Sequence, residues 1–152
     1  MEILVIDAQG GGLGKEIVTS LKKGIPEIEI AAIGTNSTAA AAMKKAGAKM
    51  AATGENAIIV SAPKAKVIIG PIGIVLADSM MGEITGEIAK AVSDSNAYKI
   101  LIPMNRCGTY VTGVVNSTIS ELINEAVEQT KKFLQIDKHS DIKCIENNKS
   151  FI

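Results

Sequence analysis

The sequence predicts a doubly wound α/β fold, in which a mostly parallel sheet is covered by helices on both faces. Short apolar runs alternate along the chain with segments whose apolar residues follow helical spacing. The first apolar run leads into "DAQGGGLGK", residues 7–15, which is typical of a turn from strand to helix. The 152 residues suit one domain, which we expect at residues 1–134, followed by a polar tail or arm at 135–152.

The first half of the chain predicts strands at residues 2–7, 28–33 and 49–52, each followed by a helix. Asn36 or Ser37 is expected to cap the second helix, because a side-chain oxygen there can accept a hydrogen bond from a free N–H group. The third strand is alanine-rich, and alanine is a poor strand former.

The second half predicts further strands at residues 67–70 and 99–102, with a helix between them whose apolar stripe includes positions 84, 88, 91 and 92. Residues 110–115 are expected to form an antiparallel edge strand, because the preceding connection is too short for a parallel crossover. Thr118 and Glu121 fit a capping box at the start of the last helix. In the tail, "DIKCIE" alternates as a short edge strand or an arm reaching a partner would.

Composition excludes several classes of partner. The 16 basic residues balance 16 acidic ones and only four residues are aromatic, so no nucleic acid partner is expected. The start "MEILVID" lacks the basic region of a signal peptide, and the most apolar later stretch is broken by glycines, Pro71 and Asp78. We therefore expect a cytoplasmic protein without a membrane partner, in which Cys107 and Cys144 are free thiols.

The glycine-rich loop is the strongest functional signal. A glycine loop between strand and helix directs backbone N–H groups and the positive helix end to one spot, which attracts phosphate or carboxylate. We expect a small phosphate-bearing ligand to contact Gln9, Gly10, Gly11, Gly12, Leu13, Gly14 and Lys15. The alternative is a tight turn without a ligand.

Three phosphate-binding templates fit the loop only in part. The dinucleotide pattern G-x-G-x-x-G matches Gly10 and Gly12 but meets Lys15 at its third position. The glycine spacing of short-chain dehydrogenases has Ala8 in its first place. The P-loop pattern has Glu16 where a magnesium-binding hydroxyl is required, which disfavours a triphosphate hydrolase. The cofactor is left unknown, with NAD(P) or another nucleotide as candidates.

The turn after the second strand lacks the acid that normally holds a ribose 2′-hydroxyl in NAD sites. It also lacks an arginine, so NADP is not favoured either. Thr35, Asn36 and Ser37 are candidates for hydrogen bonds to a ribose or phosphate, although Ser37 can also serve merely as a cap.

Further candidates follow the ends of other strands, which meet at one edge of a parallel sheet. Asp7 is expected to accept N–H groups of the loop that follows it. Glu55 is a candidate general base or helix cap beside Asn56. Gly70 lies at the end of the fourth predicted strand, and Pro71 follows it.

The segment "NRC" after the fifth strand adds Asn105, Arg106 and Cys107. Arg106 could hold a phosphate or form an ion pair with an acid. Cys107 could be a nucleophile or a buried structural cysteine. Because the chain has one histidine and two distant cysteines, no metal site is expected.

A homodimer is also expected. Hydrophobic residues make up 47% of the chain, and "GIVLADSMM", residues 73–81, is rich in apolar side chains that could be buried between subunits. The alternative is that this surface belongs to the core of one subunit.

Five stretches, "DAQGGGLGK", "IGTNSTA", "AATGENAII", "IIGPIGIVLADSMMGEIT" and "ILIPMNRC", resemble a bacterial domain-of-unknown-function family of small Rossmann-like proteins. The resemblance spans residues 1–128. It implies a Rossmann-like fold and assigns no catalytic role to any residue. It also implies shared loop residues, which are Gly10, Gly11, Gly12, Gly14, Gly54, Glu55, Asn56, Asn105, Arg106 and Cys107.

Three functions stay open, and the sequence does not decide whether the protein is an enzyme. The first is binding of a nucleotide, dinucleotide or other phosphate-bearing metabolite at the glycine loop. The second is an NAD(P)-dependent oxidoreductase. The third is a non-enzymatic oligomeric assembly or regulatory protein.

Overall fold

The computed structural model describes residues 1–104, 109–114 and 116–139, and contains one parallel sheet with the strand order β3-β2-β1-β4-β5. The strands are β1 (Ile3–Asp7), β2 (Ile30–Gly34), β3 (Met50–Thr53), β4 (Val67–Pro71) and β5 (Tyr98–Ile102). The helices are α1 (Gly12–Gly24), α2 (Ser37–Lys45), α3 (Glu55–Ser61), α4 (Gly86–Asp94) and α5 (Ile119–His139). This strand order is that of a Rossmann-like fold, with which the structure is consistent.

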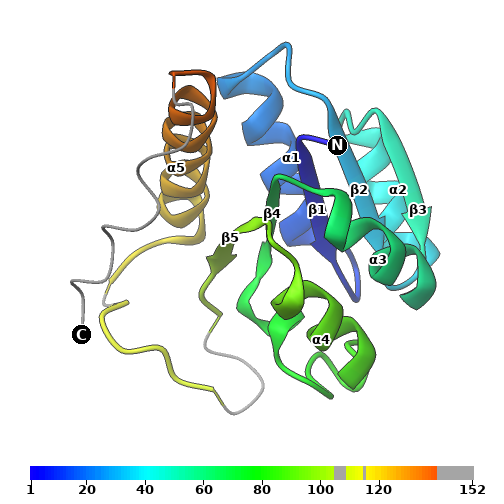
Figure 1. Cartoon of the computed structure of the whole chain (residues 1–152). Helices are drawn as coiled ribbons and strands as arrows, with labels where there is room; N and C mark the ends of the chain where they lie inside the picture. Colours follow the sequence, from blue (N-terminus) through cyan, green and yellow to red (C-terminus); the bar gives the residue numbers. More distant parts are fainter. Residues whose placement is uncertain (105–108, 115, 140–152) are drawn as a thin grey trace.

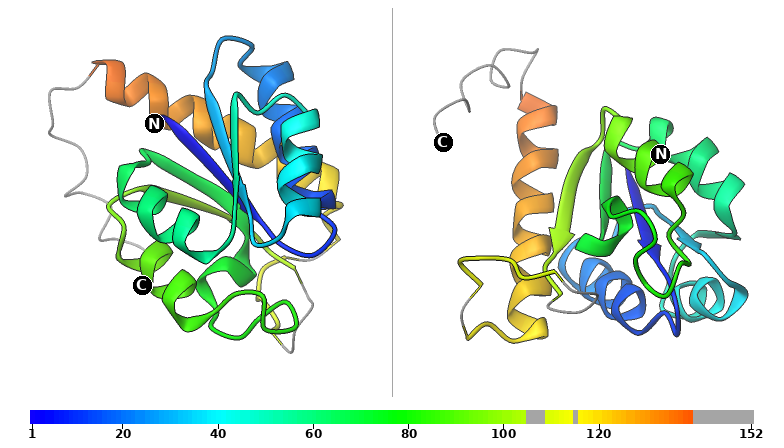
Figure 2. Two further views of the ribbon diagram at one scale, coloured as in Figure 1. Left: turned by 90° about the vertical axis from the view of Figure 1, so that its right-hand side faces the viewer. Right: turned by 90° about the horizontal axis from the view of Figure 1, so that it is seen from below.

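Helices cover both faces of the sheet, as Figure 1 shows. Ile3 and Val5 of β1 pack in one core with α1, α2 and α5, whereas Leu4 and Ile6 pack in a second core with α3 and α4. The views in Figure 2 show the same two layers of helices on either side of the strands. Because successive side chains of a strand point to opposite faces, the continuous apolar run of β1 supplies both cores.

The last helix begins at the predicted capping box. The Glu121 N–H donates to Thr118 Oγ1 at 3.2 Å, and the Thr118 N–H donates to Glu121 Oε2 at 2.7 Å. The hydrogen bonds that the Thr118 N–H and hydroxyl donate to Glu121 Oε2 lower the pKa of the Glu121 carboxyl. Further along α5, Ile123 and Val127 are buried in the core that α5 shares with α1.

Thr118→Ala is expected to lower the free energy of unfolding by about 1 kcal/mol, because the first turn of α5 loses its side-chain acceptor. Urea unfolding measures this difference. Ser120→Ala is the matched control, because Ser120 is an exposed residue of the same turn. Equal effects of the two substitutions would show that the cap does not stabilise the helix.

The prediction of an antiparallel edge strand at 110–115 is wrong for residues 110–114, the part that the structure describes. Residues 109–114 form loop and turn, and Gly113 has a φ of +87°, which interrupts extended backbone. All the strand pairs of the sheet are parallel, and β5 lies at the edge. Residue 115 and the stretch "DIKCIE" lie outside the described residues.

The remaining predicted elements are confirmed, with shifted ends. The helix predicted around Ile84 begins only at Gly86, because Thr85 is its N-cap and accepts a hydrogen bond from the Ile88 N–H at 3.2 Å. Helix α5 continues past residue 134 to His139. No helix among the described residues is long and apolar enough to cross a membrane.

Candidate functional site

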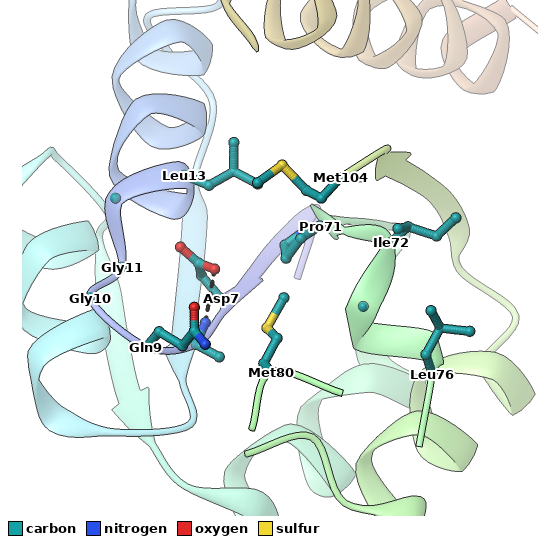
Figure 3. Close-up of a pocket in the computed structure, with 13 residues that line it drawn as sticks. Asp7, Gln9, Gly10, Gly11, Leu13, Pro71, Ile72, Leu76, Met80 and Met104 are labelled. Atoms are coloured by element: carbon teal, nitrogen blue, oxygen red, sulfur yellow. Dashed lines mark hydrogen bonds between the residues drawn. The ribbon is translucent and has the colours of Figure 1, made fainter. Parts of the chain in front are cut away.

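The pocket of interest lies where the chain changes direction across the sheet. From β1 the chain continues to β2 and β3 on one side, whereas β4 and β5 lie on the other. In open α/β sheets such a point leaves a crevice at the carboxyl ends of the strands. A cavity of about 310 Å³ lies there, between the glycine loop, residues 7–13, and a wall formed by residues 71–73, Leu76, Met80 and Met104 (Figure 3).

The glycine loop leaves several backbone donors free. Gly11 takes a left-handed conformation with a φ of +70°, and the chain then turns into α1. The Gly11 N–H donates to the Ala8 carbonyl at 3.1 Å, and the Lys15 N–H to the Gly11 carbonyl at 2.9 Å. Within the described part of the chain, the N–H groups of Gly10, Gly12 and Leu13 have no acceptor. These three residues line the cavity.

Close packing explains why residue 14 is a glycine. A Cβ atom at this position would lie 2.6 Å from Met43 Sδ and 2.7 Å from Asp7 Cβ. Gly14 is buried and does not line the cavity. Glycine at this position thus allows α1 to pack closely on β1 and α2, and the role of Gly14 as a ligand contact stays a prediction.

Asp7 holds the loop from its buried side, as predicted. Its Oδ1 accepts the Ala8 N–H at 2.8 Å and its Oδ2 accepts the Gly14 N–H at 2.6 Å. The residue is only 4% exposed and lies beside the cavity (Figure 3). Burial raises the pKa of the Asp7 carboxyl above its usual value, although these two hydrogen bonds oppose the rise. The free N–H groups of the loop and the buried carboxyl of Asp7 therefore line the same cavity.

Asp7→Asn is expected to change how stability depends on pH. Because the folded-state pKa of Asp7 is raised, its favourable contribution is complete below the unfolded value of 3.8 and is lost as pH rises through the folded value. The difference in unfolding free energy between wild type and Asp7→Asn should therefore fall with rising pH across that window. Urea unfolding of both proteins from about pH 3 to about pH 8 measures it. If the difference in unfolding free energy between the two proteins did not change with pH, the raised pKa of Asp7 would be contradicted.

The wall opposite the loop is apolar. Leu13 and Met104 reach toward one another at one end of the cavity, and Met80 and Leu76 come from the segment after β4 (Figure 3). No lysine or arginine lines the cavity among the described residues. The pocket thus offers backbone N–H donors and apolar surface.

A second carboxylate, which the sequence did not reveal, meets the outer side of the loop. Glu83 Oε2 accepts the Gln9 N–H at 3.0 Å and the Asn36 Nδ2–H at 2.9 Å, and it also accepts the Thr35 hydroxyl. These hydrogen bonds, the one from Thr35 first, lower the pKa of the Glu83 carboxyl. The sequence could not reveal this contact, because Glu83 is 47 or more positions from residues 35–36 and meets them only in the folded chain.

The predicted site residues fall into two groups. Those that line the cavity are Asp7, Gln9, Gly10, Gly11, Gly12, Leu13 and Pro71. Those that do not line it are Gly14, Lys15, Thr35, Asn36, Ser37, Glu55, Asn56 and Gly70. Thr35 and Asn36 adjoin the loop through Gln9 and Glu83. Lys15 and Ser37 are exposed, and Asn36 rather than Ser37 caps α2.

Glu55 lies away from the cavity. It is the exposed first residue of α3, and Gly54 occupies the cap position instead. Its Oε2 accepts the Thr85 hydroxyl at 2.6 Å. Gly70 is buried where β4 passes β1, and a Cβ atom there would lie 2.4 Å from the Ile6 carbonyl oxygen. Glu55 thus links α3 to the start of α4. Glycine at position 70 allows β4 to pass close to β1.

The predictions for Asn105, Arg106 and Cys107 lie outside the described residues, as does Cys144. In the apolar stretch at 73–81, Ile74 is fully buried in the core, and Met81 is 95% exposed. Part of this stretch therefore packs within one subunit, and the homodimer stays a prediction. Among the described residues no group of three or more His, Cys, Asp or Glu could hold a metal ion.

A parallel sheet in this order, with a glycine loop and a cavity at the ends of β1 and β4, defines a doubly wound α/β protein. Within this class the chain belongs to the family described as domain of unknown function DUF3842, whose model matches residues 2–135. The sequence has no match among curated proteins. The family match supports the expected membership in a family of unknown function.

Proposed function

We propose that the protein binds a nucleotide or another phosphate-bearing metabolite in the cavity beside the glycine loop. One observation carries the proposal: a cavity of about 310 Å³ borders the start of a 13-residue helix at residues whose N–H groups lack acceptors in the described structure. Cavities of this size hold small ligands. The first N–H groups of a helix favour a negative group because they carry partial positive charge.

The charges around the loop favour a phosphate that carries one negative charge. Asp7 is close to the loop, and no described cationic side chain lines the cavity. A phosphodiester or pyrophosphate bridge carries about one charge per phosphorus, so it meets less repulsion than a terminal phosphate or a triphosphate. A dinucleotide therefore suits the site better than ATP.

The apolar wall suits a ring attached to that phosphate. Leu76, Met80 and Met104 present hydrocarbon and thioether surface toward the cavity. Methionine adapts its shape and makes favourable contacts with aromatic rings. The oxidoreductase and assembly hypotheses stay predictions, because no contact among the described residues favours either.

Equilibrium dialysis against NAD+, AMP, ATP and inorganic pyrophosphate tests the proposal. We expect NAD+ to bind more tightly than ATP, because the diphosphate bridge of NAD+ carries less charge per phosphate beside Asp7. If none of the four ligands bound, the proposed function would be wrong.

A further inference from the structure

Glu83 occupies a distinctive place beside the glycine loop. Its carboxylate lies between the turn after β1 and the turn after β2, since it accepts hydrogen bonds from Gln9, Thr35 and Asn36. These two turns are neighbours because Asp7 pairs with Gly34 at the ends of the strands. In dinucleotide sites an acid at the end of the second strand holds the ribose, and this chain has no acid in that turn.

The segment between β4 and α4 positions Glu83 beside the turns after β1 and β2. Ile84 beside it is fully buried, and Thr85 caps α4. The Asp78 N–H donates to the Ile84 carbonyl at 2.7 Å, and the Ser79 hydroxyl donates to the Gly73 carbonyl at 2.6 Å. The Glu83 N–H itself donates to the Met80 carbonyl at 3.3 Å, so hydrogen bonds and the buried Ile84 hold the backbone at Glu83.

We propose that Glu83 binds the ribose diol of the nucleotide and selects a free 2′-hydroxyl over a 2′-phosphate. This inference rests on the proposed function, because the phosphate at the glycine loop has to bring the ribose to Glu83. It adds a substrate class to that function: nucleotides of the NAD type rather than the NADP type.

The hydrogen bonds of Glu83 leave one oxygen for the ligand. Oε2 already has three donors, whereas Oε1 accepts none among the described residues. The side chain is half-buried, so it can be reached from solvent. A carboxylate accepts hydroxyl hydrogen bonds strongly and repels a phosphate dianion. Oε1 thus attracts a 2′-hydroxyl and repels a 2′-phosphate.

The path from the cavity to Glu83 follows Gln9. The Gln9 N–H donates to Glu83, and its carbonyl accepts the Asn36 Nδ2–H at 2.8 Å. Gln9 and Gly10 also line the cavity. Gln9 therefore connects the cavity with Glu83, and the proposal places the two phosphates across the loop between them.

Isothermal titration with NAD+, NADP+ and inorganic pyrophosphate tests the inference on wild type and Glu83→Gln. We expect wild type to bind NAD+ about 10-fold more tightly than NADP+, and Glu83→Gln to reduce this ratio to about 2-fold or less. Glu87→Gln is the matched control, because it removes the same charge from an exposed position on α4. It should keep the wild-type ratio.

The outcomes separate the two proposals. If pyrophosphate or NAD+ binds but NADP+ binds equally well, or if Glu83→Gln keeps the wild-type ratio, the ribose assignment is wrong and the loop remains a phosphate site. If none of the three ligands binds, the proposed function fails and the ribose assignment fails with it. Circular dichroism of both variants shows whether the fold is intact.

Discussion

Gly14→Val is expected to lower the free energy of unfolding by about 3 kcal/mol, the largest stability effect of the substitutions considered. The new Cβ would overlap Met43 Sδ and Asp7 Cβ, at 2.6 Å and 2.7 Å. Both neighbours are buried, so neither can move into solvent. The substitution also disturbs the hydrogen bond from the Gly14 N–H to Asp7. Urea or thermal unfolding measures the effect.

Gly12→Val is the matched control, because a Cβ atom at Gly12 meets nothing within 4 Å. It should change the unfolding free energy by no more than about 0.5 kcal/mol. If both variants were as stable as wild type, the close packing of α1 against Asp7 and Met43 would be contradicted. Because Gly14→Val acts on stability, it is unsuitable as a test of ligand binding.

Gly12→Glu is expected to weaken binding of NAD+ or pyrophosphate by about 100-fold without unfolding the protein. The space beside Gly12 accepts a side chain, and Gly12 lines the cavity. A glutamate there places a negative charge and a longer side chain beside the free N–H groups of the loop. Isothermal titration measures the loss of affinity.

Gly86→Glu is the control for this substitution. Gly86 is also the first residue of its helix, and a Cβ atom there also meets nothing within 4 Å. Both variants therefore add the same charge to the same helix position, but Gly86 does not line the cavity. Similar losses of affinity in the two variants would contradict a site at the glycine loop.

Local signals in the sequence predicted much of the fold. Thr118 with Glu121 marks the start of α5, and Asn36 marks the start of α2, because each signal depends on atoms only three residues apart. The apolar run of β1 predicted a strand buried on both faces. The wrong edge strand at 110–115 shows the limit, because the sequence of this stretch did not reveal the left-handed turn at Gly113.

Apart from Pro71, the candidate site was predicted only on its glycine side. The residues from Asp7 to Leu13 are contiguous, so their meeting at one turn follows from the chain itself. Met80, Met104 and Glu83 reach the same region from distant segments, and nothing local in their sequence marks them. Glu83 in particular accepts hydrogen bonds from Thr35 and Asn36, in the turn where the sequence lacks an acid. Its position depends on the packing of Ile84 in the core.

Amide NMR tests most directly whether the start of α1 is a phosphate site. In 1H–15N spectra recorded during a titration with NAD+, the N–H signals of Gly10, Gly12 and Leu13 should show the largest shifts. Gly86→Glu protein should show the same pattern, and Gly12→Glu protein should not. Unchanged signals for these three residues at saturating NAD+ and at saturating pyrophosphate would contradict the account.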